Sequence, residues 1–166
     1  MQQLKNMKGV KQMTPLKIVI VCTGNTCRSP MAEVMATQIF ANAGLEVEVT
    51  SAGVNAMHGQ PASRHAVTVM KGNGLCLLSH KAAIVSGDML ATAALVLTMT
   101  GSHRAVLLSD YPATKGKVFT LAEYVGDDAN VADPFGGSVD EYRACAMQIR
   151  GLLVLVAEKL RQGWVQ

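Results

Sequence analysis

The segment from Cys22 to Ser29 constrains this chain more than any other, because it places a cysteine and an arginine where an apolar run, Leu16–Val21, gives way to a helical pattern. A tetrahedral oxyanion is bound by convergent backbone N–H groups and by the positive end of a helix dipole. A short loop that leads into a helix supplies both. Arg28 adds a planar charged fork that can hold two phosphate oxygens. The sequence therefore predicts a phosphate-binding loop.

The same loop carries a candidate nucleophile. A positive field at a helix N-terminus favours the thiolate form of a cysteine, so we expect Cys22 to attack a bound phosphorus atom. Gly24 and Asn25 suit the unusual backbone angles of a tight loop. Ser29 is expected to cap the following helix and Pro30 to occupy its first position. The alternative, a buried strand-end cysteine and a surface arginine, is disfavoured by the complete strand, loop and helix context.

Three segments of the chain resemble one known family. Val21–Glu33 resembles the active-site signature of the low-molecular-weight protein tyrosine phosphatases, Asp133–Ser138 resembles their acid loop, and Ser51–Gly53 is also similar to that family. The likeness runs from about residue 16 to the C-terminal helix. Within the family, Thr26 and the glycine pair after Asp-Pro-Phe are most similar to the branch known as protein arginine phosphatases. The resemblance implies an α/β domain with a four-stranded parallel sheet and helices on both faces.

Length and composition agree with one compact enzyme domain. With 166 residues, 49% of them hydrophobic, the chain can bury one core and is too short for two ordinary domains. We expect a mobile N-terminal extension at residues 1–15 and a phosphatase domain at residues 16–166. The net charge is only +3, and no basic arm or aromatic-basic pattern indicates a nucleic-acid partner. The sequence carries no signal for the oligomeric state.

Targeting and cofactor signals are weak. Residues 1–15 contain no apolar core of a secretory signal, and the longest apolar stretch, Leu152–Ala157, is too short to span a bilayer. The four cysteines lack the spacing of a disulfide scaffold or a zinc site, which favours a reducing compartment. We therefore expect a cytoplasmic protein without membrane attachment, metal or cofactor.

Cys76 and Cys145 are expected in the core. Four histidines without ligand spacing are interpreted as surface or loop residues: His58, His65, His80 and His103.

Strand and helix patterns alternate along the chain. Two nearly continuous apolar runs predict strands buried on both faces, at Leu16–Val21 and Ala94–Met99. Weaker, edge-like strands are expected at Val47–Ser51 and Lys117–Leu121. Helical patterns cover residues 30–42, 62–73, 86–92, 102–109 and 139–161. The last helix begins with a capping-box pattern at Ser138. This alternation predicts a parallel sheet that binds its ligand beyond the carboxyl ends of the strands.

Phosphoryl transfer through a thiolate also needs a proton for the leaving group and an activated water, and one carboxylate can supply both in turn. The final loop region offers four candidates: Asp127, Asp128, Asp133 and Asp140. Asp133 is preferred because Pro134 fixes the backbone beside it and Phe135 can form a pocket wall, while two glycines let the loop bend. Asp-Pro alone is a common turn. Beside a cysteine loop it is interpreted as the catalytic acid.

Other loop residues are expected to support the site. Ser29 is expected to hydrogen-bond the thiolate, with Asn25 and Ser51 bracing the loop, although each could merely cap local backbone. The remaining loop residues expected to bind substrate are Thr23, Gly24, Thr26 and Cys27. Cys27 lies close enough in sequence to Cys22 for a reversible disulfide that protects against irreversible oxidation. A passive buried thiol is the alternative.

The choice of substrate depends on Thr26 and on the residues after Asp133. Family members that cleave phosphotyrosine commonly have two aromatics after Asp-Pro, whereas here Phe135 is followed by two glycines. A small polar Thr26 and a carboxylate suit the cationic guanidinium of phosphoarginine. We therefore expect a protein-arginine phosphatase that acts on phosphorylated proteins through a cysteinyl-phosphate intermediate.

Three other functions fit the sequence less well. A protein-tyrosine phosphatase is the main alternative. Arsenate reduction would need a further, closely spaced redox pair, and Cys76 and Cys145 lie far apart in sequence. A non-catalytic anion-binding or redox-sensing module is disfavoured by the presence of Asp133.

Overall fold

The computed structural model describes residues 14–163, so residues 1–13 of the expected N-terminal extension lie outside the described residues. Four parallel strands form one sheet in the order β2-β1-β3-β4. The strands are β1 (Leu16–Cys22), β2 (Val47–Gly53), β3 (Leu95–Thr98) and β4 (Val118–Thr120). The predicted four-stranded parallel sheet is confirmed. The two continuous apolar runs are the central strands and the two weaker patterns are the edges, as expected.

The helices follow the predicted alternation. They are α1 (Arg28–Asn42), α2 (Arg64–Gly72), α3 (Gly87–Thr92), α4 (Gly101–Asp110), α5 (Leu121–Tyr124) and α6 (Val139–Arg161). A 3₁₀ turn also forms at Pro112–Thr114. This turn and α5 were not predicted, because elements of three or four residues are too short to show a helical period. The predicted capping box at Ser138 is confirmed, with Glu141 as its second member.

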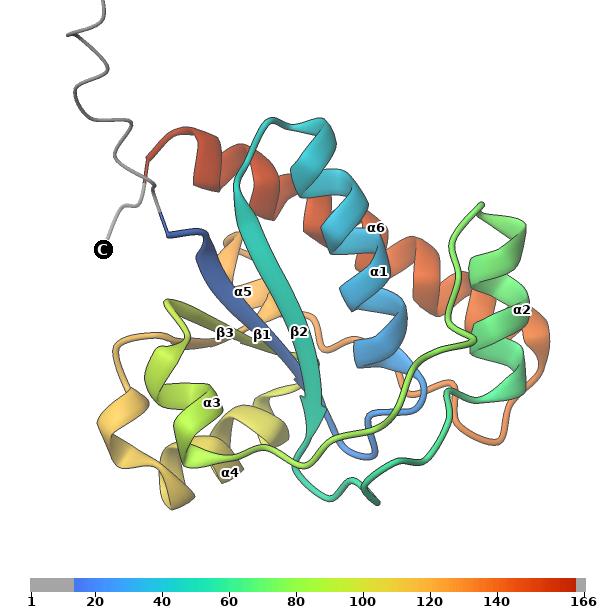
Figure 1. The fold of residues 1–166 in the computed structure, drawn as a ribbon, viewed down its shortest axis with the longest axis horizontal. Coiled ribbons are helices and arrows are strands. Elements are labelled where there is room, and N and C mark those ends of the chain that lie inside the picture. The colour runs from blue at the N-terminus through green and yellow to red at the C-terminus, as the bar shows by residue number, and fades with distance from the viewer. Residues whose placement is uncertain (1–13, 164–166) are drawn as a thin grey trace, which may run out of the picture.

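Helices cover both faces of the sheet, with α1 and α6 on one face and α3 and α4 on the other (Figure 1). Alternate side chains of a strand point to opposite faces. In β1, Ile18 and Ile20 enter the core on the α1 and α6 side, while Val19 and Val21 enter the core on the α3 and α4 side. All four are buried, each contributing roughly 1.5–3 kcal/mol of hydrophobic free energy. The strand that ends at Cys22 is therefore fixed from both sides.

The core prediction is right for one of two cysteines and wrong for the other. Cys145 is buried in α6, where burial raises the pKa of its thiol to about 12 and keeps it protonated. Cys76 was also expected in the core, but it is exposed in the turn after α2. Its neighbour Leu77 is buried instead, because only one of two successive side chains in this extended turn can point inward.

Candidate active site

The predicted phosphate-binding loop lies between the carboxyl end of β1 and the start of α1 (Figure 1). Strand β1 is the point at which the strand order reverses, the position where open α/β sheets bind ligands. The loop is fastened to the segment after β2. Val54 N–H donates to the Cys22 carbonyl oxygen at 3.0 Å, and Asn55 N–H donates to the Thr23 carbonyl oxygen at 2.9 Å.

Asn25 braces the loop from the inside. It is the one non-glycine residue between residues 14 and 163 with a positive φ, 54°, a conformation that asparagine tolerates better than most residues. Its side chain is fully buried. The amide nitrogen donates to the hydroxyls of Ser29 and Ser51, each at 2.9 Å, and the amide oxygen accepts from Ala83 N–H at 2.9 Å. The unusual loop backbone is therefore stabilised by three hydrogen bonds from one side chain.

This network bears on the hydrogen bond between Ser29 and Cys22, for which the Ala52 carbonyl oxygen, 3.4 Å from Ser29 Oγ, is a competing acceptor. The Ser51 hydroxyl donates to the carboxylate of Glu33, since an ionised carboxylate can only accept. Asn25 uses its two amide protons on the two serines, so the Ser29 hydroxyl proton remains available to others. The Ser29 oxygen lies 2.9 Å from Cys22 Sγ. Ser29 can therefore donate its proton to the thiolate form of Cys22.

The predicted helix cap at Ser29 is wrong. Helix α1 begins at Arg28, and Ser29 lies within its first turn with its side chain turned toward the thiol of Cys22. No side-chain hydrogen bond caps this helix. Pro30 consequently occupies the third helical position rather than the first, where the absence of its N–H costs nothing because the first N–H groups of a helix have no partner within it.

Arg28 and the predicted acid Asp133 lie together although more than a hundred residues separate them in sequence. The Arg28 side chain is 4% exposed, and its two terminal nitrogens bind the Val131 carbonyl oxygen at 3.2 Å and Asp133 Oδ2 at 3.2 Å. The other Asp133 oxygen accepts from Phe135 N–H at 3.1 Å. Val131 N–H donates to the Met99 carbonyl oxygen at 2.9 Å, which fastens the acid loop to the end of β3.

Two histidines interpreted as surface or loop residues contact the phosphate-binding loop instead. His80 Nε2 lies 2.7 Å from the Asn25 carbonyl oxygen. His103, near the start of α4, is 6% exposed, and its Nε2 lies 2.8 Å from Thr23 Oγ1. Burial lowers the pKa of His103 to about 4, with a further lowering by Arg28 and an opposing effect of Asp133. The His103 ring is therefore neutral at pH 7.

The other two histidines differ from each other. His58 is exposed, as expected. His65 packs edge-on against the ring of Tyr142, with 5.4 Å between ring centroids. Sequence spacing could not reveal these long-range contacts, although the position of His103 in the first turn of the helix after β3 was an available signal.

Cys27 is a buried residue of the loop that contacts α6. Cys22 and Cys27 are both buried free thiols. The Cys27 sulfur lies 3.1 Å from the Tyr142 hydroxyl of α6, and burial, together with this hydrogen bond, raises the pKa of Tyr142 to about 12. A neutral phenol therefore holds Cys27 in place.

A pocket of about 500 Å³ opens above Cys22. Its lining brings together eleven residues: Cys22, Thr23, Gly24, Thr26, Cys27, Arg28, Asn55, Met57, Gln60, Asp133 and Phe135. Eight of these were predicted to be site residues; Asn55, Met57 and Gln60, from the segment after β2, were not. Phe135 is the one aromatic residue in the lining and is 78% exposed at its rim. The expected supports Asn25, Ser29 and Ser51 lie beneath the loop.

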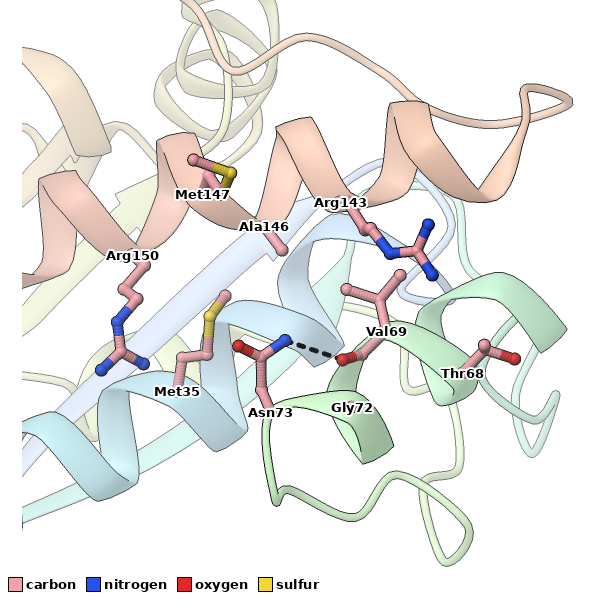
Figure 2. A pocket seen from close by; sticks show the side chains of 9 residues that line it. All are labelled: Met35, Thr68, Val69, Gly72, Asn73, Arg143, Ala146, Met147 and Arg150. Atoms are coloured by element: carbon pink, nitrogen blue, oxygen red, sulfur yellow. Dashed lines mark hydrogen bonds between the residues drawn. The ribbon is translucent and has the colours of Figure 1, made fainter.

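A second pocket, of about 250 Å³, lies between α1, α2 and α6 (Figure 2). Met35 and Val69 supply apolar side chains, and α6 contributes the side chains of Arg143 and Arg150, of which Arg150 extends toward α1. Asn73 donates a hydrogen bond to the Val69 carbonyl oxygen at 2.8 Å, across one edge of the pocket. This pocket contains none of the predicted site residues.

Within residues 14–163, no three histidine, cysteine or acidic side chains gather as metal ligands. Over the same residues, no helix has the length and hydrophobicity needed to cross a bilayer.

Gly53 offers a direct test of the loop geometry. A Cβ atom at this position would clash with the Thr23 carbonyl oxygen and would lie 3.0 Å from Asn25 N. Both contacts are backbone atoms of the loop, which cannot yield without moving the pocket. We expect Gly53→Ala to lower phosphate affinity at least tenfold, measured by calorimetric titration with inorganic phosphate. Gly72→Ala, a matched control with open space around its Cα, should leave that affinity unchanged.

Known proteins are similar to this chain over most of its length. Residues 17–164 match the family model described as low molecular weight phosphotyrosine protein phosphatase. The chain is 40% identical to a protein-arginine-phosphatase of Bacillus subtilis, covering 89% of this chain and 98% of that protein. It is 42% identical to a protein-arginine-phosphatase of Geobacillus stearothermophilus, covering 89% and 97%.

A solved structure agrees with the fold. A cysteine-to-serine variant of the YwlE arginine phosphatase, with a phosphorylated active-site serine, superposes with a TM-score of 0.87 at 40% identity. The superposition covers 89% of this chain and 97% of that one.

Proposed function

The chain belongs to the low molecular weight phosphotyrosine protein phosphatase family, and we propose that it removes phosphate from arginine side chains of proteins through a cysteinyl-phosphate intermediate. The observation that carries this proposal is the pocket lining, in which Cys22, Arg28 and Asp133 share one cavity with the hydroxyl-bearing Thr26. The relatives named protein-arginine-phosphatase support the choice of substrate.

In the first step, the loop amides and Arg28 hold the phosphoryl oxygens, and Cys22 attacks phosphorus. The S–P bond forms as the P–N bond to the guanidine nitrogen breaks. Asp133, in its protonated form, gives its proton to that nitrogen, so the arginine side chain leaves as a guanidinium and not as a species deprotonated at that nitrogen. Arg28 and Asp133 are 3.2 Å apart, so both groups reach the same reacting centre.

In the second step, the Asp133 carboxylate takes a proton from water, and the water oxygen attacks phosphorus. The S–P bond breaks, inorganic phosphate leaves, and the thiolate of Cys22 is restored. Ser29, 2.9 Å from the sulfur, stabilises this thiolate by donating a hydrogen bond. Asn25 and Ser51 act through Ser29 and the loop backbone.

The walls of the pocket favour a guanidinium over a phenyl ring. Asn55 and Gln60 add side-chain amides, and Asp133 adds a carboxylate, all of which can accept hydrogen bonds from guanidinium N–H groups. A flat ring would find a single aromatic partner, Phe135, at an exposed rim. Thr26 is a half-buried residue of the lining, and its Oγ1 lies 3.6 Å from Cys27 Sγ.

Replacing Thr26 with isoleucine tests this choice. The change adds apolar bulk and removes a hydroxyl while Cys22, Arg28 and Asp133 remain. We expect kcat/KM for a phosphoarginine peptide to fall about ten- to a hundredfold relative to a phosphotyrosine peptide of the same sequence. Thr26→Ser, which keeps the hydroxyl, should preserve the preference. If Thr26→Ile lowers both activities by one factor, phosphotyrosine becomes the better-supported substrate.

Two further assignments complete the proposal. We assign Cys27 as the redox partner of Cys22, since both thiols are buried in the same short loop. A thiol nucleophile acts only when reduced, which favours a reducing compartment such as the cytoplasm. Protein-tyrosine phosphatase activity stays the second candidate, because the family model carries that description. The ion pair of Arg28 with Asp133 favours a catalyst over a passive anion-binding module.

A further inference from the structure

Three side chains form a hydrogen-bonded line from the start of α4 to the phosphate-binding loop. Thr100 Oγ1 lies 3.0 Å from His103 Nδ1, and His103 Nε2 lies 2.8 Å from Thr23 Oγ1. Thr23 is exposed and lines the pocket above Cys22, whereas His103 is buried. The line therefore connects a buried ring to a residue that lines the pocket.

The contacts of Thr100 favour one tautomer of His103. Its hydroxyl oxygen accepts from the backbone N–H of His103 at 3.3 Å, as the cap of α4. Among the described residues, the acceptor within reach of its own proton is Nδ1 of the same ring. If Thr100 donates to Nδ1, the ring proton of neutral His103 is on Nε2, which donates to Thr23. The Thr23 oxygen then accepts from the ring, and its own proton is free to point into the pocket.

We propose that His103 is a positioning residue that holds Thr23 as a hydrogen-bond donor to a phosphoryl oxygen of the substrate. This inference rests on the proposed phosphatase function and adds a residue to its phosphate-binding machinery. Without the ring, the Thr23 side chain can rotate among its staggered rotamers, and its proton has no fixed direction. The contribution of His103 is therefore made through Thr23 and does not require a charge on the ring.

The chemistry of phosphate supports a donor at this position. Phosphoryl oxygens are acceptors only, and hydrogen bonds to charged oxygens are stronger than those between neutral groups. A donating hydroxyl beside Cys22 adds to Arg28 and the loop amides on the same ligand. A hydroxyl that gave its proton to the ring would instead present lone pairs to the negative oxygens and would repel them.

The test compares three variants with the unmodified chain, using a phosphoarginine peptide for kcat/KM and inorganic phosphate for calorimetric binding. His103→Leu and Thr23→Val should each lower kcat/KM, and the phosphate affinity, about tenfold. The double variant should lose no more than either single one, because both changes remove the same hydrogen bond. His103→Gln, whose amide N–H replaces Nε2–H, should recover activity to within about threefold.

Ser102→Ala on the same helix is the matched control, since Ser102 is exposed and outside the pocket lining, and it should match the unmodified chain. Losses that multiply to about a hundredfold in the double variant would show that His103 does not act through Thr23. Unchanged phosphate affinity in Thr23→Val would remove the donor role. If the unmodified chain hydrolyses neither phosphoarginine nor phosphotyrosine peptides, the proposed function fails, and phosphate binding still decides the role of His103.

Discussion

Replacing Cys22 with serine should abolish turnover while phosphate binding survives. The loop amides and Arg28 remain in place, but a serine hydroxyl ionises far less readily than a thiol, and a phosphate ester on oxygen is a poorer intermediate for release. We expect steady-state activity to fall by at least about 10⁴-fold. Incubation with substrate should leave at most one phosphoryl group on the introduced hydroxyl, detected by intact-mass spectrometry.

The phosphorylated active-site serine of the YwlE variant is the same kind of trapped species in a relative. Cys145→Ser is the matched control, because that thiol is buried in α6 with its pKa raised, and it should retain turnover. Substantial turnover by Cys22→Ser would exclude the covalent thiol mechanism.

Asparagine in place of Asp133 should slow the step in which the leaving group needs a proton, by about 10²- to 10⁴-fold. The amide keeps the size of the carboxyl group and can still accept from Phe135 N–H, so the loop is expected to hold its shape. It cannot carry a proton to the guanidine nitrogen. Single-turnover measurement with a phosphoarginine peptide reports this step directly.

An aryl phosphate with an acidic phenol needs little proton transfer to its leaving group, so Asp133→Asn should slow its cleavage much less. Asp128→Asn, an exposed change in the same loop region, serves as the control and should have no effect. An equal loss for the peptide and the aryl phosphate would remove Asp133 from the acid role.

Much of the fold follows from local patterns in the sequence. The run Leu16–Val21 and the run at β3 are apolar on both faces because each strand feeds two cores, and this makes a central strand visible without any homologous sequence. The capping box at Ser138 marks the start of α6 because its members are three residues apart. Short elements such as α5 left no comparable signal.

The nucleophile loop was predictable because its parts are contiguous, and the same contiguity explains what was missed. His80 and His103 contact the loop from distant parts of the chain, and Glu33 binds Ser51 beside it, and a single sequence contains no record of such pairings. Ser29 looked like a helix cap because serine is common there, yet its hydroxyl is used by Cys22. At Ser29, the contact with Cys22 therefore decides the side-chain position, although the local preference of serine favours a helix cap.

The most direct test of the proposed arginine phosphatase is the ratio of kcat/KM values for two peptides of one sequence, carrying phosphoarginine or phosphotyrosine at the same position. With Thr26, Asn55 and Asp133 lining the pocket and a single aromatic at its rim, phosphoarginine should be preferred by about ten- to a hundredfold. A preference of the same size for phosphotyrosine would contradict the proposal.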